Sequence, residues 1–405
     1  MILIYRIYFK NTNKLCSHFI IMSFACFCRC FIAVFFLMEI CYFCKSINSN
    51  VMFENKKISS IEPLFEDFSK QRFNIENRRY IGNKAKLTDW IISIILKETK
   101  NVKIFADLFA GTASVSYAAS RYFKDIIVND TLFANNTIYK AFFKQEKWNK
   151  YLIQTILDKY NNLDLSSLED NYFSIYFGDK FFDKINSRLI GFIRDDIEKR
   201  KPELNEKEYS ILLTCLIYSI DKIANTVGHF DAYIKKSIQY KKLNLRLINP
   251  IEGPNFSIFR EDANILAEKI NADLVYIDPP YNSRQYNRFY HLYETLVKWD
   301  RPKLYGTALK PIAENSSIYC TVKAKHAFQL LIEDIKAKYI VVSYNNTYFS
   351  KSNSSENKIK LETIEEILNN KGKTKIFELS HKFFNTGKTE FVNHKELLFL
   401  TETDE

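Results

Sequence analysis

The sequence predicts an α/β protein with a mostly parallel, doubly wound sheet and an inserted, mainly helical domain. Short apolar segments with strand character alternate with longer segments of helical periodicity. Residues 131–255, which are mostly helical in pattern, separate the second predicted strand from the third. Nine glycines and eight prolines are too few for a flexible linker between domains. These observations favour one sheet that is interrupted by a smaller domain.

The elements follow in a regular order. We expect parallel strands at Val102–Phe109, Asp125–Asp130, Phe256–Glu261, Asp273–Asp278 and Lys338–Tyr344, with Lys375–Leu379 and Glu396–Leu400 as a final pair. We expect helices from the end of the first strand to Tyr122, over Leu132–Tyr160, and over Lys207–Thr226. The polar stretch Ser350–Asn357 is typical of a surface loop. The predicted domain organisation is an N-terminal segment (residues 1–51), two parts of a sheet domain (52–140 and 251–405) and the helical insertion (141–250).

Composition excludes several classes of protein. Hydrophobic residues make up 47% of the 405 and charged residues 26%, which excludes a wholly disordered or fibrous chain. There are 58 Lys and Arg against 47 Asp and Glu, a net charge of +11. This basic balance favours a polyanionic partner, either nucleic acid or an acidic membrane surface.

The first 44 residues differ from the rest, because they hold six of the eight cysteines (Cys16, Cys26, Cys28, Cys30, Cys41 and Cys44). Phe19–Cys44 is almost continuously apolar. Three interpretations compete: a signal or anchor after Arg6, Lys10 and Lys14, a metal or redox site, and a mis-assigned start with translation from Met52. Arg29 and Glu39 would each cost about 2.5–3.5 kcal/mol near a bilayer centre, and phenylalanine and isoleucine flank the cysteines. We therefore favour the start at Met52.

Asp278-Pro279-Pro280-Tyr281 is the sharpest motif, because it directly follows an apolar strand. Open parallel sheets bind ligands at the carboxyl ends of their strands. Two prolines end the strand and leave the Pro279 carbonyl without an obvious donor. A carboxylate and a carbonyl beside the aromatic ring of Tyr281 suit a planar heterocycle that carries an exocyclic amine.

A second motif ends the first strand of the sheet. Asp107-Leu-Phe109-Ala-Gly111-Thr-Ala113 places small residues in a turn before a helix, where a cofactor can approach the backbone. Asp130 ends the next strand, where a carboxylate can bind ribose hydroxyls. The order of these residues within one βαβ unit predicts a nucleotide-type cofactor site.

These motifs resemble the D12 class of DNA N6-adenine methyltransferases, from about Arg79 to near the C-terminus. Arg79-Tyr80-Ile-Gly82-Asn83-Lys84 resembles the N-terminal cofactor motif of that class. Asp107, Phe109 and Gly111 match its cofactor loop, in which Ala113 replaces the last glycine. The resemblance implies a Rossmann-like fold, S-adenosylmethionine as cofactor, and cofactor contacts from Tyr80, Gly82, Lys84, Asp107, Phe109, Gly111, Asp130, Asp262 and Ala263. It also implies a catalytic loop formed by Asp278, Pro279, Pro280 and Tyr281.

The same resemblance implies transfer of a methyl group to N6 of an adenine flipped out of duplex DNA, with Tyr281 stacking on the base. Asp221–Tyr233 and Asn282–Tyr286 are similar to a subgroup of restriction–modification systems, which implies a cognate endonuclease encoded nearby without a stable complex. That subgroup suggests a short palindrome such as CATG. The alternatives are cytosine-N4 methylation, a catalytically idle DNA-binding protein, and a membrane-anchored protein. We expect a cytoplasmic, nucleoid-associated protein without a metal.

Basic residues predict where DNA lies. Tyr233–Leu247 contains five cations, two tyrosines and no acid, a composition typical either of phosphate contact or of a solvated face. Cys215 lies in an apolar helical run and is expected in the core. His291, His326 and His381 are expected to have structural roles. The predicted DNA contacts are Lys235, Lys236, Lys241, Lys242, Arg246, Arg284 and Arg288.

Overall fold

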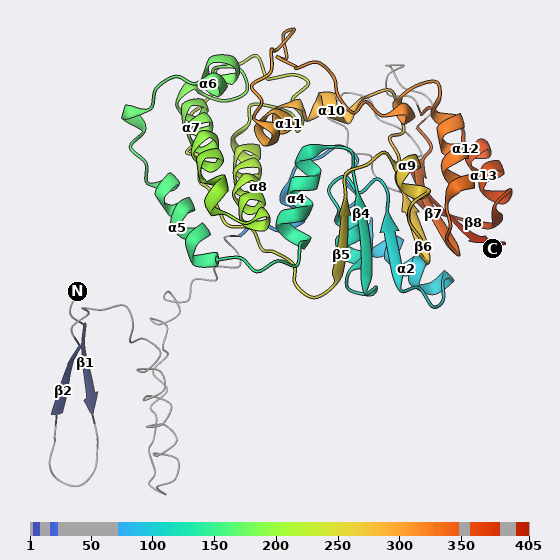
Figure 1. Ribbon diagram of the computed structural model, residues 1–405, viewed down its shortest axis with the longest axis horizontal. Coiled ribbons are helices and arrows are strands. Elements are labelled where there is room, and N and C mark those ends of the chain that lie inside the picture. Colours follow the sequence, from blue (N-terminus) through green and yellow to red (C-terminus); the bar gives the residue numbers. More distant parts are fainter. Residues whose placement is uncertain (1–2, 9–16, 23–71, 348–356, 381–393, 405) are drawn as a thin grey trace, which may run out of the picture. The chain divides into compact units, whose positions relative to one another are not determined.

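The computed structural model describes residues 3–8, 17–22, 72–347, 357–380 and 394–404, in two compact units that divide at residue 66 (Figure 1). In the first unit, β1 (Leu3–Tyr8) pairs antiparallel with β2 (Ser17–Met22). The cysteine-rich remainder of the first unit lies outside the described residues, so its three interpretations stay open. None of the helices in the described ranges is both long enough and apolar enough to cross a membrane.

The second unit is built on a mixed seven-stranded sheet with the order β5-β4-β3-β6-β7-β9-β8. The strands are β3 (Ile104–Asp107), β4 (Asp125–Asn129), β5 (Asn255–Phe259), β6 (Leu274–Ile277), β7 (Tyr339–Asn345), β8 (Gly372–Ser380) and β9 (Lys395–Thr403). The first five in this order are parallel, and β9 pairs antiparallel with both β7 and β8. All seven predicted strands are thus confirmed, with small shifts in their bounds, and the last two form the expected pair.

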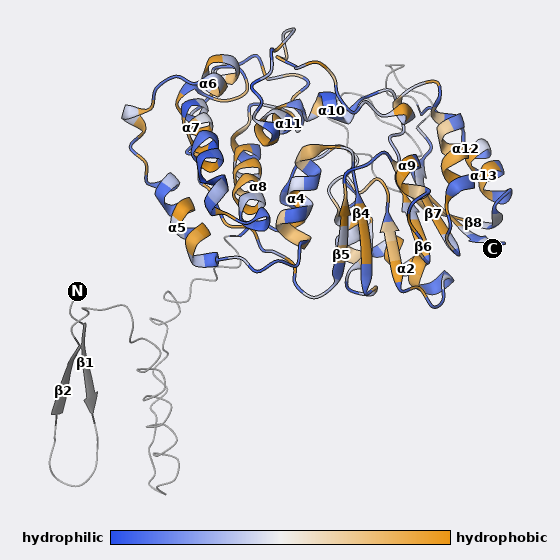
Figure 2. Ribbon diagram, viewed as in Figure 1, coloured by the Kyte–Doolittle hydropathy of each residue, from blue (hydrophilic) through white to orange (hydrophobic). Residues whose placement is uncertain are grey.

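Helices cover both faces of this sheet, because the central strands bury side chains on both sides. The ribbons of these strands are largely in the hydrophobic colour in Figure 2. On one face, Phe105 and Tyr276 pack against α2 (Thr88–Glu98) and α3 (Ser114–Ala119). On the opposite face, Ala106 and Val275 pack against three further helices, α9 (Ala263–Ala267), α12 (Ala324–Asp334) and α13 (Leu361–Asn369). The prediction of a doubly wound sheet is therefore confirmed for its parallel part.

A second group of helices lies beyond the β5 edge (Figure 1). These are α4 (Phe133–Phe143), α5 (Lys150–Asn161), α6 (Tyr172–Phe177), α7 (Lys184–Arg200), α8 (Glu206–Ile223), α10 (Tyr286–Phe289) and α11 (His291–Lys298). Short 3₁₀ turns lie at Ile75–Asn77, Leu165–Ser167, Lys201–Glu203 and Ile318–Cys320. Buried side chains of all seven helices belong to one hydrophobic core. The domain boundaries at residues 140 and 250 stay a prediction.

The single helix predicted over Leu132–Tyr160 is wrong, because the structure has two helices, α4 and α5, with a break between them. Asn149 ends the break, since its side chain accepts a hydrogen bond from the Leu152 N–H at 3.0 Å and so caps α5. Residues 144–149 (KQEKWN) form the break, and they contain neither glycine nor proline to mark the end of α4 in the sequence.

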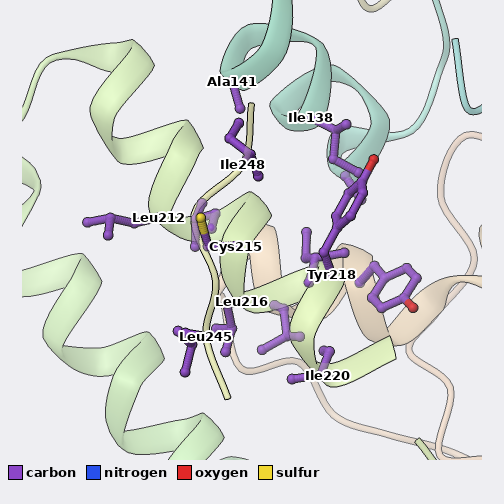
Figure 3. Packing of buried hydrophobic residues seen from close by; sticks show 14 of the residues in the cluster. Ile138, Ala141, Leu212, Cys215, Leu216, Tyr218, Ile220, Leu245 and Ile248 are labelled. Atoms are coloured by element: carbon purple, nitrogen blue, oxygen red, sulfur yellow. The ribbon is translucent and has the colours of Figure 1, made fainter. Parts of the chain in front are cut away.

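Helix α8 lies at the centre of this core (Figure 3). Asn205 and Glu208 form a capping box at its start. Cys215 points into an apolar surrounding that includes Leu212 and Ile248, and burial raises the pKa of its thiol to about 12. The thiol is thus an unreactive core group, as expected.

Candidate active site

A cavity of about 360 Å³ opens at the carboxyl ends of β3, β4 and β6. It brings together residues predicted from five separate segments of the chain. Its wall includes Tyr80, Gly82, Lys84, Asp107, Phe109, Gly111, Asp130, Asp262, Ala263, Asp278 and Pro280. Pro279 and Tyr281 do not line this cavity, although they belong to the same loop.

Asp278 follows β6 and forms the polar centre of the loop. Its Oδ1 atom accepts hydrogen bonds from Lys84 Nζ at 3.0 Å and from the Tyr281 hydroxyl. Lys84 Nζ also lies 2.8 Å from that hydroxyl, so the three groups form a closed triangle. Within the part of the chain that the structure describes, Oδ2 of Asp278 forms no hydrogen bond. One carboxylate oxygen is therefore fixed by the protein, and the other remains able to accept a donor.

The Lys84–Asp278 pair is largely shielded from water, with side-chain exposures of 7% and 16%. Burial raises the pKa of Asp278, and the positive charge of Lys84 opposes this rise. Burial alone would lower the pKa of Lys84, but the carboxylates of Asp278 and Glu396 outweigh it, so this pKa is raised. Lys84 is consequently a permanent cation beside the DPPY loop.

The Tyr281 ring packs beside the loop and does not line the cavity. Its ring centroid lies 4.5 Å from that of Tyr344, and Lys84 Nζ lies 5.0 Å from the Tyr281 centroid. Its carbonyl accepts hydrogen bonds from the Lys358 N–H at 2.7 Å and the Tyr344 hydroxyl at 3.4 Å. The predicted stacking of Tyr281 on a flipped base stays a prediction, while its hydroxyl has a role in orienting Asp278. Among the described residues, no hydrogen bond reaches the Pro279 carbonyl.

The loop after β3 takes a tight path because two of its residues have left-handed backbone conformations, Gly111 (φ +55°) and Ala113 (φ +57°). A Cβ atom at Gly111 would lie 3.3 Å from Cε1 of Tyr80, so this glycine also permits a close approach. Asp130 holds the turn by accepting the Gly111 N–H at 3.1 Å, and Tyr139 donates its hydroxyl to the Gly111 carbonyl at 2.7 Å.

Asn83 is a site residue that the sequence motif contained without a role. Its Oδ1 atom accepts hydrogen bonds from Thr112 Oγ1 at 3.1 Å, Ser114 Oγ at 3.0 Å and the Ala85 N–H at 2.9 Å. The N-terminal motif and the loop after β3 are thereby joined. Only its place between Gly82 and Lys84 pointed to it in the sequence.

Asp107 lines the cavity with a carboxylate of which only one oxygen has a hydrogen-bond donor among the described residues. Ser116 donates a hydrogen bond to its Oδ2 atom at 2.7 Å, whereas Oδ1 is buried and lacks a partner among the described residues. Burial raises the pKa of this carboxyl to about 7. An acceptor of this kind is expensive to leave unpaired, so it suits a ligand with a positively charged donor.

Aromatic rings form another wall of the cavity. Tyr80 stacks on Tyr290 with centroids 4.5 Å apart and on Tyr286 at 5.3 Å. The Arg78 guanidinium lies 4.8 Å from the Tyr80 centroid. Asp262 lines the cavity and also caps α9 by accepting the Asn264 N–H at 2.9 Å. Tyr286 and Tyr290 follow the DPPY loop in the sequence, but no periodicity links them to Tyr80.

The cofactor motif is also tied to the helical region through Asp221, which is 2% exposed. Its carboxylate accepts hydrogen bonds from the Arg79 N–H at 3.1 Å and from the Tyr293 hydroxyl at 2.8 Å. This acid belongs to the subgroup motif of the sequence, where its role was not apparent.

The predicted DNA-contacting residues occupy different environments. Lys235, Lys236, Lys241 and Lys242 are exposed and form no ion pair within the described ranges, and Arg284 is exposed as well. Arg246 lies over the Phe73 ring at 4.4 Å, and Arg288 donates a hydrogen bond to the Pro311 carbonyl at 2.6 Å. Both of these arginines therefore already have contacts within the protein.

The end of the basic segment (Tyr233–Leu247) is anchored on the helical region. Leu243, Leu245 and Leu247 are buried in the helical core. Asn186 donates to the Lys241 carbonyl at 2.8 Å, and Asn161 donates to the Leu245 carbonyl at the same distance. Lys242 and Asn244, which lie next to these leucines in the sequence, are exposed.

Comparison with known proteins identifies the family. The model of the D12 class N6 adenine-specific DNA methyltransferases matches residues 80–367, which include the cofactor loop, the helical region and the DPPY loop. The chain belongs to this family. The mixed sheet with helices on both faces is consistent with a methyltransferase fold. In the part of the chain that the structure describes, no group of three His, Cys, Asp or Glu residues could hold a metal ion.

The relatives of this D12 class chain are modification enzymes. It is 33% identical over 352 residues to the Type II methyltransferase M.FokI of Planomicrobium okeanokoites, which covers 80% of this chain and 53% of that protein. It is 30% identical over 335 residues to M.NlaIII of Neisseria lactamica, covering 78% and 95%. The Modification methylase StsI of Streptococcus sanguinis is 34% identical over 295 residues, covering 66% and 44%. The chain thus spans about half of M.FokI and nearly all of M.NlaIII.

Proposed function

We propose that this protein transfers a methyl group from S-adenosylmethionine to N6 of an adenine in duplex DNA, as the modification enzyme of a restriction–modification system. The observation that carries the proposal is Asp278, whose Oδ1 is held by Lys84 and Tyr281 while Oδ2 remains able to accept a donor. Membership of the D12 class and the names of the relatives support the same activity.

The residues of the cavity fit the proposed cofactor. The Oδ1 atom of Asp107 suits the ammonium group of a methionine moiety, which would give this buried acceptor a donor. Asp130 suits the ribose hydroxyls, and Asp262 and Ala263, which also line the cavity, suit the cofactor's adenine. When bound, the cofactor supplies a methyl group on an electrophilic sulfonium.

The catalytic loop would increase the low nucleophilicity of the methyl acceptor, the adenine amino nitrogen. The lone pair of an adenine amino group is delocalised into the ring, so the nitrogen is a poor nucleophile. Hydrogen bonds from its two N–H groups to Asp278 Oδ2 and to the Pro279 carbonyl would localise that pair and stabilise the developing positive charge. The nitrogen would accept the methyl group as the carbon–sulfur bond breaks, and it would then release one proton to solvent water. Lys84 and Tyr281 contribute by holding Asp278 in this orientation.

DNA binding is proposed for the basic segment, where the outward-facing lysines at 235, 236, 241 and 242 are free to contact phosphates. Such contacts set affinity and salt dependence rather than sequence preference. The exposed Arg284, two residues before α10 and three after Tyr281, is proposed to contact phosphates or base edges. CATG as recognition sequence, and a separately encoded endonuclease, remain predictions from the subgroup resemblance.

The test is an assay of the full chain with duplex DNA and S-adenosylmethionine labelled in the methyl group, followed by digestion to nucleosides. Label in N6-methyladenosine supports the proposal, and Asp278→Asn should abolish it while retaining cofactor binding. Label in N4-methylcytidine would show the alternative specificity. DNA binding without label in any nucleoside would show an idle DNA-binding protein instead.

A further inference from the structure

A second cavity of about 210 Å³ lies beside the first. Helices α10 and α11 form one side of it, and residues 300–314 form the other. Asn287 is the one residue that lines both cavities in the described part of the chain. The volume is below the roughly 300 Å³ at which pockets for drug-sized ligands begin, so it suits a single small ring system.

Asn287 presents an acceptor without a donor. Its Nδ2 atom donates to the Glu314 carbonyl and to Ser316 Oγ at 3.2 Å, which fixes the orientation of the amide. In this orientation its Oδ1 atom is buried and has no hydrogen-bond partner among the described residues. The whole residue is 8% exposed. If the amide were rotated by half a turn, Oδ1 would face the Glu314 carbonyl, which cannot donate a hydrogen bond. Nδ2 and Oδ1 therefore cannot exchange places.

His291 presents a second acceptor. Its Nε2 atom lies 3.0 Å from the Phe230 carbonyl, so Nε2 must carry the ring proton. Burial lowers the pKa of His291 to about 4, which keeps the ring neutral. Nδ1 is therefore a lone-pair acceptor, and it too is buried without a partner in the described chain. The expected structural role of His291 accounts for Nε2 and leaves Nδ1 unused.

The remaining walls suit a planar ring. Tyr305 lines the cavity and is 47% exposed, so its ring has a face available for stacking. Lys303 Nζ lies 5.6 Å from the centroid of that ring and adds a positive charge next to it. Base–aromatic stacking is independent of base identity, whereas acceptors select a base that carries an amino group.

We propose that this cavity binds a second nucleobase of the DNA substrate, one that presents an exocyclic amino group to Asn287 and His291 and stacks on Tyr305. The inference rests on the proposed function, because it takes DNA as the ligand. Asn287 then forms the partition between the methylated adenine's site and a base that the enzyme reads. Its amide thus makes this cavity part of the enzyme's sequence specificity.

The experiment is a scan of single amino groups in a duplex that carries the recognition sequence. The sequence is taken from the methylated positions of the labelled assay, or from binding selection on random duplexes if no transfer occurs. Purine replaces each non-target adenine, inosine each guanine and 2-pyrimidinone each cytosine. Binding of the full chain is measured at fixed salt by fluorescence anisotropy.

At one position, loss of the amino group should weaken binding by the wild type about tenfold. Tyr305→Ala should lose most of that discrimination, whereas Tyr305→Phe should keep it. Tyr151→Ala is the matched control, because Tyr151 is 79% exposed on α5 and does not line the cavity. Such coupling between a base and a side chain is the signature of direct contact.

The inference is overturned if no position depends on its amino group, or if Tyr305→Ala discriminates as well as the wild type. A cavity that holds only water would give that result. The two proposals can be refuted separately. If no methyl group is transferred but the Tyr305-dependent preference is intact, only the proposed activity is refuted. Normal transfer without such a preference would remove the second base site alone.

Discussion

Lys84 Nζ lies 3.0 Å from Asp278 Oδ1, so a cation and a carboxylate that are 194 residues apart in the sequence form one ion pair. The resemblance to the D12 class implies that Lys84 contacts the cofactor. In the structure it also holds the acid of the DPPY loop. The cofactor motif and the catalytic loop are consequently one electrostatic unit.

Lys84→Met should therefore lower methyl transfer about a hundredfold, because Asp278 loses the donor that orients it. The acid limb of the pH–rate profile should also move to higher pH. Lys84 opposes the rise in the pKa of Asp278 that burial causes, so its removal raises that pKa further, and the ionised carboxylate then needs a higher pH. Lys86→Met, at an exposed neighbouring position, should change neither quantity. An unchanged acid limb in Lys84→Met would contradict the role of the pair.

Cofactor affinity should fall as the pH is lowered through about 7. The pKa of Asp107 in the free protein is raised to about 7 by burial, and only its ionised form can pair with an ammonium group. Below that pKa, the dissociation constant should rise about tenfold for each pH unit, measured by isothermal titration calorimetry. Asp107→Asn should bind weakly without this dependence, and Asp89→Asn, at an exposed site on α2, should behave as the wild type. A pH-independent wild type would refute the assignment.

The Asp107 carboxyl also affects the pH dependence of the free energy of unfolding, with the sign opposite to that of an ion-paired acid. The folded-state pKa of about 7 is above the usual 3.8, so the folded protein binds more protons between these values. The contribution of Asp107 to the free energy of unfolding should therefore decrease as pH rises from about 4 to about 7. Saturating cofactor should reduce this decrease, as thermal unfolding at several pH values would show.

Ala113→Gly should leave the free energy of unfolding unchanged or raise it by up to about 1 kcal/mol. Ala113 has a φ of +57°, a conformation that costs an L-residue roughly 1–2 kcal/mol, and glycine's greater freedom in the unfolded chain offsets part of the gain. Ala118→Gly, in the helix that follows, should instead cost about 1 kcal/mol. Urea denaturation distinguishes the two. A loss of stability in Ala113→Gly as large as that in Ala118→Gly would argue against strain at this turn.

Replacing Lys241 and Lys242 by alanine should weaken DNA binding equally for all sequences. If each lysine neutralises one phosphate, the slope of log affinity against log salt should become smaller by about 1.8. Lys325→Ala with Lys373→Ala is the matched control, since both lysines are exposed and lie on α12 and β8. Equal losses in the two double variants would show that the basic segment has no special role.

The fold could be predicted largely because its signals are local. The strands β3, β4 and β6 are short apolar runs bounded by polar residues, and the DPPY and Asp107 loops follow directly from strand ends. The break between α4 and α5 was not predicted, because it depends on one capping side chain, Asn149, in a stretch without glycine or proline.

It could be predicted from the sequence which residues form the site, but not how their side chains contact one another. Parallel strands place Asp107 and Asp278 at one edge, so their proximity follows from topology. The partners of Lys84 and the orientation of the Asn287 amide depend on side chains that meet only after folding. No spacing rule in the sequence relates residues that lie on different elements at such distances along the chain.

The Asp221 carboxylate, which holds both the Arg79 backbone and the Tyr293 hydroxyl, has a consequence for ligand binding. Any shift of the helices α8 and α11 on DNA must move the segment that carries Tyr80 and Lys84. Two ligands that share such an element change each other's affinity by the same factor. The cofactor product and DNA should therefore change each other's affinity, which titration of each ligand in the presence of the other would measure.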